Sequence, residues 1–302
     1  MSKHLLPTPA EDEFALGYLG RLTHLNGINS AESCLHDLRK SFGTPAAAAF
    51  RLKTVAQAAR QNCSDFLRTH TIAPAIVCGK DVSRGLVGGN LSYRCPDVRN
   101  PMRLFRSNGY FCEDCVTAQR DKNGFGYWHR VHQLPGIYWC PWHKRPLFKC
   151  DGNWVTEKLP SWRLDVTETA TEVCDAIGHP TLNRYNEVIM KFLYHPCPID
   201  ELALLALLTK AAEKRGVKTW KWEPGSSLLS DIVFESIPAW WLRDVCSVSE
   251  KVHGEFFREI DDAVNAARVG TQVYALTAAI LLDEDNLDIT EARRSTPLMC
   301  VD

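Results

Sequence analysis

Apolar residues recur every three or four positions in the N-terminal part of the chain, which is typical of amphipathic helices. This spacing predicts a helix over 12–25, with the acids Asp12 and Glu13 in its first turn, where the helix dipole favours negative charge. An Asn-Gly pair ends that helix, and Ser30 is placed to cap a second one over 31–42. The chain therefore opens with two short helices.

An alanine-rich stretch over 46–59 predicts a third helix, and Ser64 is a candidate cap for a fourth that ends at His70. A tight turn joins the two, and the small Ala56 would let the fourth helix cross closely. This is the arrangement of a helix-turn-helix, whose second helix enters the major groove of DNA. A purely structural helical hairpin has the same pattern, so both interpretations stay open.

Residues 71–110 are rich in glycine and predict loops and short strands, with arginines standing among aromatic residues. Such interleaving suits phosphate contact and base stacking, although a solvated loop with scattered charge has the same composition. The candidate DNA-binding residues from this stretch and the preceding helices are Arg51, Lys53, Arg60, Arg68, Arg94, Arg99, Arg103 and Arg106.

After residue 150 the chain becomes helical and acidic. Helices are predicted over 200–215, 226–234, 239–246, 255–268 and 272–282. We expect the core of this part to be anchored by its tryptophans, at positions 220, 222, 240 and 241.

The charge along the chain is uneven, although the net charge of the 302 residues is only −1. Residues 1–38 carry −3, residues 39–149 carry +12 and residues 150–302 carry −10. A basic segment of this kind is typical of proteins that bind polyanions. The acidic part could equally pack on the basic part and neutralise it.

Composition and cysteine usage indicate a globular intracellular protein. Hydrophobic residues make up 45% and charged residues 24%, which excludes a disordered or collagenous chain. The first thirteen residues hold two prolines and three acids, so we expect no signal peptide, and the apolar stretches at 202–208 and 273–282 are too short to span a membrane. We therefore expect a cytoplasmic protein in which paired cysteines bind metal rather than form disulfides.

The most specific motif is a pair of metal-binding knuckles. Cys112 and Cys115 form C-x2-C, and after twenty-four residues Cys140 and His143 form C-x2-H. Four such ligands suit tetrahedral Zn²⁺ and leave no open position, so one structural zinc ion is expected. The aromatic and polar alternation over 126–139 predicts a β-hairpin between the knuckles. The remaining cysteines lack this pairing and are interpreted as small buried residues.

Motifs for enzyme chemistry are missing: the sequence has no H-E-x-x-H, no G-x-x-x-x-G-K-[ST] and no G-x-S-x-G. We therefore expect a protein that is not an enzyme. A zinc-containing DNA-binding transcription regulator remains an alternative, as does a metal-dependent nuclease or hydrolase, which would need an open metal position.

Three groups of residues carry a resemblance to a known family. They are the opening from Pro9 to the Asn-Gly pair, the helix-turn-helix running into His70-Thr71, and the two knuckles with the Tyr127–Pro135 segment between them. On these residues, over about 7–150, the sequence resembles the TniQ/TnsD family of transposon targeting proteins. The resemblance implies a non-catalytic adaptor that links a target site to an AAA+ ATPase transposition regulator.

Some members of that family bind an attachment site in DNA directly, and others associate with a CRISPR RNA-guided complex. The resemblance also places the ATPase contact in the N-terminal region, with Asp12 and Glu13 as candidate partner-binding residues. A second knuckle pair found in some members is reduced here to Cys150. We allow for a homodimer and expect no membrane partner.

The expected fold is thus mainly α with a small β zinc-ribbon-like module. We expect an N-terminal helical region over 1–75 that contains the helix-turn-helix, and a loop-rich module with a Cys3His zinc finger over 76–150. An acidic helical domain over 151–302 would follow.

Overall fold

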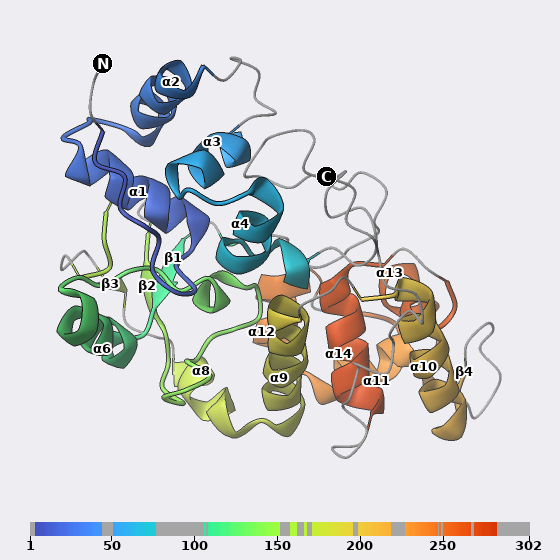
Figure 1. Ribbon diagram of the computed structural model, residues 1–302. Coiled ribbons are helices and arrows are strands. Elements are labelled where there is room, and N and C mark those ends of the chain that lie inside the picture. The colour runs from blue at the N-terminus through green and yellow to red at the C-terminus, as the bar shows by residue number, and fades with distance from the viewer. Residues whose placement is uncertain are drawn as a thin grey trace. The chain divides into compact units, whose positions relative to one another are not determined.

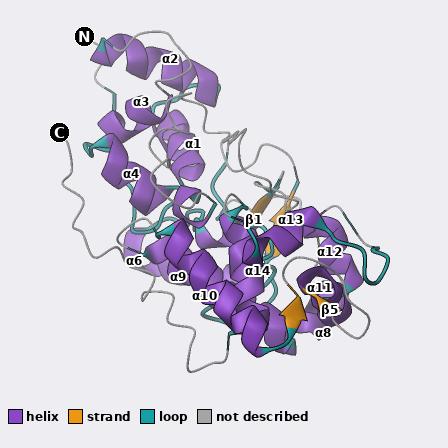
Figure 2. Ribbon diagram, turned by 90° about the vertical axis from the view of Figure 1, so that its right-hand side faces the viewer, coloured by secondary structure: helices purple, strands orange, loops and turns teal. Residues whose placement is uncertain are grey.

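The computed structural model describes residues 4–43, 51–76, 106, 108–151, 158–161, 166–167, 171–195, 199–218, 227–246, 248, 250–266 and 269–282. These residues form two compact units. The first unit contains the described residues of 4–74 and 106–179, and the second contains those of 75–76 and 180–282. The chain is mainly helical, as predicted (Figures 1 and 2). The division into three regions expected from the sequence, at 1–75, 76–150 and 151–302, remains a prediction.

Most helices of the first unit come before its sheet. The elements are α1 (Ala15–Leu25), α2 (Ala31–Phe42), α3 (Arg51–Ala58), α4 (Cys63–His70), β1 (Gly109–Phe111), α6 (Glu113–Asn123), a 3-10 turn η2 (Val131–Gln133), β2 (Phe148–Cys150), β3 (Val166–Thr167), α8 (Thr171–Asp175) and η3 (Ala176–Gly178). A further 3-10 turn, η1, spans Ala73–Ala75.

The first two helices largely follow their sequence signals. In α2, the hydroxyl of Ser30 accepts a hydrogen bond from the backbone N–H of Ser33 at 3.2 Å, and Gly43 ends the helix with a left-handed φ of 65°. The predicted start of the first helix is wrong. Asp12 has a φ of 60°, and Glu13 pairs with His129 in an antiparallel bridge, so neither acid belongs to α1.

The third and fourth helices form the predicted helical pair, with two local differences. The α3 helix is described from Arg51 onward, and the first part of the predicted 46–59 helix lies outside the described residues. The cap of α4 is Asn62 rather than Ser64, because the Asn62 side chain accepts from the backbone N–H of Asp65 at 2.8 Å. The two helices pack together through buried apolar side chains, among them Val55 and Phe66.

A small antiparallel sheet brings distant parts of the first unit together, in the order β1-β2-β3. Phe111 lies opposite Phe148, and their rings stack with centroids 5.5 Å apart. The β-hairpin predicted over 126–139 is wrong, because this segment holds isolated bridges and the η2 turn instead of paired strands. Side chains satisfy backbone groups in the first part of the segment: Gln119 accepts from the N–H of Tyr127 at 2.8 Å, and Gln133 donates to the carbonyl of His129 at 3.0 Å.

The second unit consists mainly of helices. Its elements are α9 (Pro180–Tyr194), α10 (Glu201–Lys214), β4 (Val217–Lys218), β5 (Ser227–Leu228), α11 (Leu229–Ser236), α12 (Ala239–Cys246), α13 (Arg258–Asp261), a 3-10 turn η4 (Asp262–Val264) and α14 (Thr271–Leu281). Strands β4 and β5 pair in parallel. Helix α14 is buried along its whole length and packs against α9 and α10.

Most helices predicted for this part are present, and the helix predicted over 200–215 is α10, which is capped by the Asp200 side chain. The helix predicted over 255–268 is wrong in length, since only α13 and the η4 turn form there. The α9 helix was not predicted. Of the four tryptophans, Trp241 is fully buried and Trp240 partly buried, whereas positions 220 and 222 lie outside the described residues.

The prediction that the cysteines outside the knuckles are buried is confirmed only in part. Cys34, Cys150 and Cys246 are buried, but Cys63 and Cys174 are exposed. Within the described ranges, no helix combines the length and the apolar character that crossing a bilayer requires.

A tight contact inside the first unit gives a test of this packing. A Cβ atom added at Gly17 of α1 would lie 2.8 Å from Cδ1 of Trp128, a fully buried side chain. We therefore expect Gly17→Ala to lower the free energy of unfolding by about 1–3 kcal/mol through overpacking. Thermal or urea unfolding measures this. Gly178→Ala is the matched control, because a Cβ there has no neighbour within 4 Å. Equal stability of the two variants would contradict the packing described.

Candidate metal centre

The first knuckle lies at the start of a helix. Cys112 is the residue that caps α6, and Cys115 lies in the first turn of that helix, where the backbone N–H of Val116 donates to the carbonyl of Cys112 at 3.0 Å. The positive end of a helix dipole favours a thiolate over a thiol. This position therefore suits two cysteines that act as metal ligands.

The second knuckle is a tight turn. The backbone N–H of Cys140 donates to the carbonyl of Arg145 at 2.8 Å, and that of Lys144 donates to the carbonyl of Cys140 at 2.9 Å. Lys144 takes a left-handed φ of 52°, which reverses the chain directly after His143. An antiparallel bridge between Trp139 and Pro146 closes the turn. The turn thereby holds the Cys140 and His143 side chains on one side.

The four predicted ligands come together, with their ligand atoms within 4.8 Å of one another. Nδ1 of His143 lies 3.4, 3.3 and 3.4 Å from Sγ of Cys112, Cys115 and Cys140, and the sulfurs of Cys115 and Cys140 are 3.6 Å apart. Bonds of about 2.0–2.3 Å to a tetrahedral ion place neighbouring ligand atoms roughly 3.4–3.8 Å apart. The cluster therefore has the size and donor set to hold one metal ion.

The three thiols also disturb one another's protonation. Hydrogen bonds from Cys115 and Cys140 hold the pKa of Cys112 far below its usual value. The contact with Cys112 in turn raises the pKa of Cys115 and of Cys140. Cys150, the residue in place of a second knuckle, is not part of the cluster, and burial raises its pKa to about 11. Within the described residues, the metal-ligand set is thus the predicted one.

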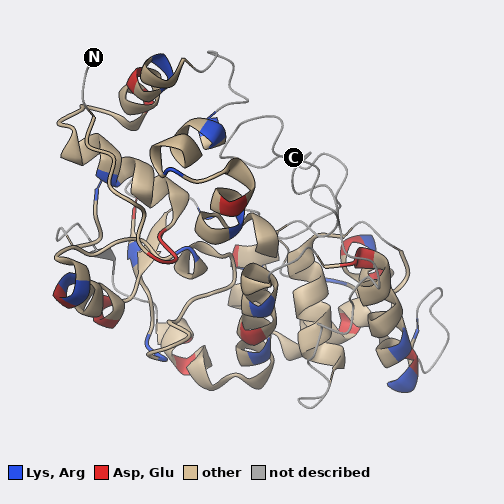
Figure 3. Ribbon diagram, in the orientation of Figure 1, with Lys and Arg blue, Asp and Glu red and all other residues tan. Residues whose placement is uncertain are grey.

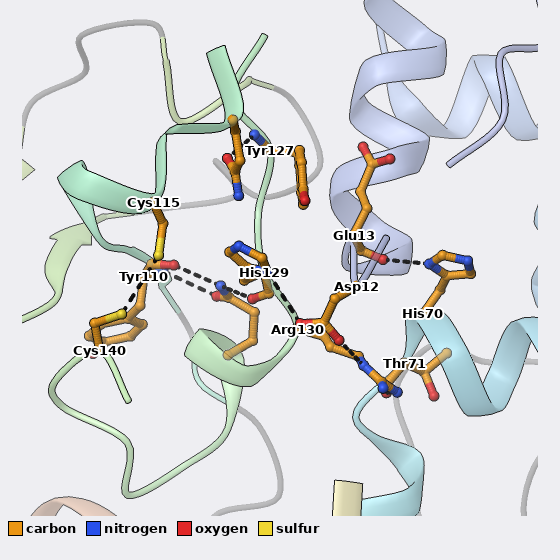
Figure 4. A network of polar contacts seen from close by, with 12 residues as sticks. Asp12, Glu13, His70, Thr71, Tyr110, Cys115, Tyr127, His129, Arg130 and Cys140 are labelled. Atoms are coloured by element: carbon orange, nitrogen blue, oxygen red, sulfur yellow. Dashed lines mark hydrogen bonds and ion pairs between the residues drawn. The ribbon is translucent and has the colours of Figure 1, made fainter. Parts of the chain in front are cut away.

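A clasp joins this metal-binding part to the N-terminal helices; we use the word for Asp12–Phe14 and the segment Trp128–Arg130. The backbone N–H of Phe14 donates to the carbonyl of Trp128 at 2.7 Å, and that of Arg130 donates to the carbonyl of Asp12 at 3.2 Å. The Asp12 carboxylate accepts from Arg130 and lies 3.2 Å from Nδ1 of His129 (Figure 4).

The helical pair α3–α4 is attached to the same clasp. The Arg130 guanidinium donates to the carbonyls of Arg68 and Thr71, the latter at 3.2 Å. His70 Nδ1 lies 3.0 Å from the carbonyl of Glu13 (Figure 4). Burial lowers the pKa of His70, so the neutral ring is favoured at this position.

The expectation that the candidate partner residues Asp12 and Glu13 are exposed acids is wrong. Glu13 is fully buried, and its carboxylate accepts two hydrogen bonds from Arg21, at 2.9 and 2.6 Å. The Asp12 side chain is 12% exposed and is held within the clasp. Both acids stabilise the first unit, because removing one partner of a buried ion pair leaves the other charge without compensation.

The candidate DNA-binding residues lie in different surroundings. Lys53, Arg60 and Arg68 are exposed on or next to α3 and α4, and Arg68 forms an ion pair with Asp65 at 3.3 Å. Arg51 pairs with Glu32 at 2.9 Å. Arg106 is packed 3.8 Å from the ring centroid of Tyr110 and donates to the carbonyl of His132, so it has internal partners. Positions 94, 99 and 103 lie outside the described residues.

Sequence reasoning missed several residues that position the site. The Gln133 side chain donates to the carbonyl of Tyr110 at 2.7 Å and accepts from its N–H at 3.1 Å, and it thereby fixes β1 beside the first knuckle. The two histidines between the knuckles are also packed: His132 is buried, and His129 lies against Trp142 with ring centroids 5.0 Å apart. No local pattern signals these long-range contacts.

Comparison with models of protein families gives a match. The TniQ family model matches residues 4–147. This chain carries a TniQ domain. The domain contains α1 to α4, both halves of the clasp and all four metal ligands, so the features described above form its framework. No curated protein matches the chain.

The metal cluster of the TniQ domain can be tested directly. We expect Cys112→Ser to abolish binding of one metal ion per chain and to lower the melting temperature, because metal binding is coupled to folding. Cys150→Ser is the control, since it also removes a buried thiol but no ligand. Elemental analysis of both purified variants measures the difference. Equal metal content in Cys112→Ser and wild type would contradict the ligand assignment.

Proposed function

We propose that this protein is a non-catalytic transposition targeting adaptor, which acts in the cytoplasm. It would link a target DNA site, directly or through a CRISPR RNA-guided complex, to an AAA+ ATPase transposition regulator. The TniQ domain over residues 4–147 is the observation that carries this proposal. The metal cluster agrees with it, since four protein ligands leave no position for a substrate.

Zinc is the metal we propose for this cluster. Three sulfurs and one imidazole nitrogen in a space of tetrahedral size suit Zn²⁺ better than the oxygen-preferring Mg²⁺ or Ca²⁺. The ion would cross-link α6 to the second knuckle and would thereby stabilise the folded state. Elemental analysis of protein purified without added metal identifies the ion.

Nucleic-acid contact is proposed for the helical pair α3–α4. Lys53, Arg60 and Arg68 are exposed there, and residues 39–149 carry a net charge of +12. Figure 3 shows basic positions on both α3 and α4, with acidic positions on α4 as well. The arrangement of two short helices with a tight turn is compatible with a helix-turn-helix that lies on DNA. Cationic side chains at this surface would contact phosphates and position the protein without reading sequence.

This surface gives a prediction for free DNA. We expect the triple variant Lys53→Glu, Arg60→Glu, Arg68→Glu to bind duplex DNA at least tenfold more weakly than wild type. Wild-type binding should also fall steeply with salt, because phosphate contacts release counterions. Fluorescence anisotropy at several salt concentrations measures both effects.

The matched control is Lys191→Glu, Lys210→Glu, Lys214→Glu, which reverses the same number of charges in the second unit. Equal binding by the two triple variants would contradict the proposed surface. Wild-type binding too weak to measure would instead favour targeting through a guide complex.

The contact with the ATPase is proposed for the exposed part of the N-terminal region. Leu5 and Leu25 are 62% and 43% exposed, so they offer apolar surface that a partner could cover. The backbone of Leu5 is hydrogen-bonded in both directions to the Asn26 side chain, at 2.7 and 3.0 Å, so Leu5 is held beside the end of α1. Together with the exposed acid Glu11, these residues replace the buried Asp12 and Glu13 as partner candidates.

We expect the double variant Leu25→Glu, Glu11→Lys to lose association with the genetically linked ATPase in a pull-down and to lower transposition frequency at least tenfold. The metal content of the variant should stay unchanged, because both residues are exposed. Leu202→Glu is the control, since Leu202 is similarly exposed at 66% but belongs to the second unit.

Failure of wild-type protein to bind that ATPase, with or without DNA and ATP, would contradict the adaptor function. Sequence-specific binding to a promoter in the absence of the ATPase would instead support a transcription regulator. The exposed basic residues of α3 and α4 make that the second candidate.

A further inference from the structure

A small cavity lies beside the metal cluster, in the first unit, and two of the proposed metal ligands, Cys115 and His143, form part of its wall. Its volume is about 250 Å³. Pockets for drug-sized ligands begin at about 300 Å³, so this cavity has room for one small planar group. Three elements line it, namely α6, the segment that follows α6, and the second knuckle.

Aromatic rings form one side of the cavity. Tyr127, His129 and Trp142 line it, with ring centroids 5.1 Å apart for Tyr127 and His129 and 5.0 Å apart for His129 and Trp142. The Trp142 side chain is 47% exposed, although burial of its large apolar ring would be favourable. An exposed tryptophan at the edge of an aromatic cavity provides a face on which another ring can stack.

A buried side-chain amide at the same cavity has a donor without a hydrogen-bond partner. Gln119 is only 6% exposed, and its Oε1 accepts from the backbone N–H of Tyr127 at 2.8 Å. Its Nε2 has no hydrogen-bond partner among the described residues. Leaving a buried donor unsatisfied is costly, so this amide indicates a ligand with an acceptor atom.

The charge of the lining is one-sided. Lys122 of α6 also lines the cavity, and no Asp or Glu does. A cationic side chain beside aromatic rings and an amide donor matches a nucleotide, in which a phosphate adjoins a planar base with acceptor atoms. An apolar protein side chain would use only the rings, and an acidic one only the lysine. A nucleotide uses the rings, the amide donor and the lysine.

We propose that this cavity binds one unpaired base of a single-stranded nucleic acid. The base stacks on Trp142, one of its acceptor atoms receives a hydrogen bond from Gln119 Nε2, and the adjoining phosphate lies near Lys122. Single-stranded DNA and RNA share this chemistry.

The test uses labelled ten-nucleotide strands that are abasic throughout, compared with strands that carry one central base, in both DNA and RNA. For wild-type protein we expect the single base to raise affinity about 5- to 100-fold in fluorescence anisotropy. If the base raises affinity only in DNA or only in RNA, that nucleic acid is the source of the bound base. Trp142→Ala should remove the gain and leave binding to the abasic strand unchanged, whereas Trp142→Phe should keep most of it.

Gln119→Glu separates recognition from packing, because it keeps the acceptor for Tyr127 but removes the free donor. We expect it to lower the gain while the metal content stays at the wild-type level. Phe256→Ala is the matched control, since Phe256 is also 47% exposed but lies in the second unit.

Three results would overturn the proposal. The first is no gain from the base with either backbone in wild-type protein. The second is a gain that survives Trp142→Ala. The third is that Trp142→Ala abolishes binding of the ATPase but not of the base, which would assign the cavity to a protein side chain.

Discussion

The first unit depends on the clasp between Asp12–Phe14 and Trp128–Arg130. Two backbone hydrogen bonds align these segments, and the guanidinium of Arg130 extends the contact to the end of α4. Within the clasp, Glu13 neutralises Arg21 of α1, and their side chains are only 0% and 5% exposed. Buried charges persist only when they are paired and hydrogen-bonded, so α1 and α4 are fixed relative to the segment between the knuckles.

The clasp also connects the metal cluster to the surface proposed for partner binding. His129 belongs to the clasp, and its ring lies against Trp142, which directly precedes the ligand His143. A bound ion would therefore order the second knuckle, which would support His129 and, through it, the start of α1. In this account the metal acts at a distance. It keeps the N-terminal surface in one conformation, which reduces the entropy lost when a partner binds.

The sequence was informative wherever the signal is local. Ser30 was recognised as a cap because a cap bonds to the backbone two or three residues away. The metal ligands were found because each knuckle pairs residues only three positions apart. Asp12 and Glu13 were misinterpreted because the partners that bury them include Arg130, more than a hundred positions later. The prediction of a hairpin over 126–139 is wrong for a related reason. The Gln133 side chain donates hydrogen bonds to backbone carbonyls that strand pairing would otherwise have satisfied.

Coupling between the metal cluster and α1 is the central claim, and hydrogen exchange of backbone amides measures it directly. The amides of α1 should be compared in metal-loaded protein and in protein treated with a chelator. The account predicts that metal removal speeds exchange in α1 as well as around the ligands, because the clasp loses its support from the second knuckle. Faster exchange around the ligands, with α1 protected as before, would contradict the account.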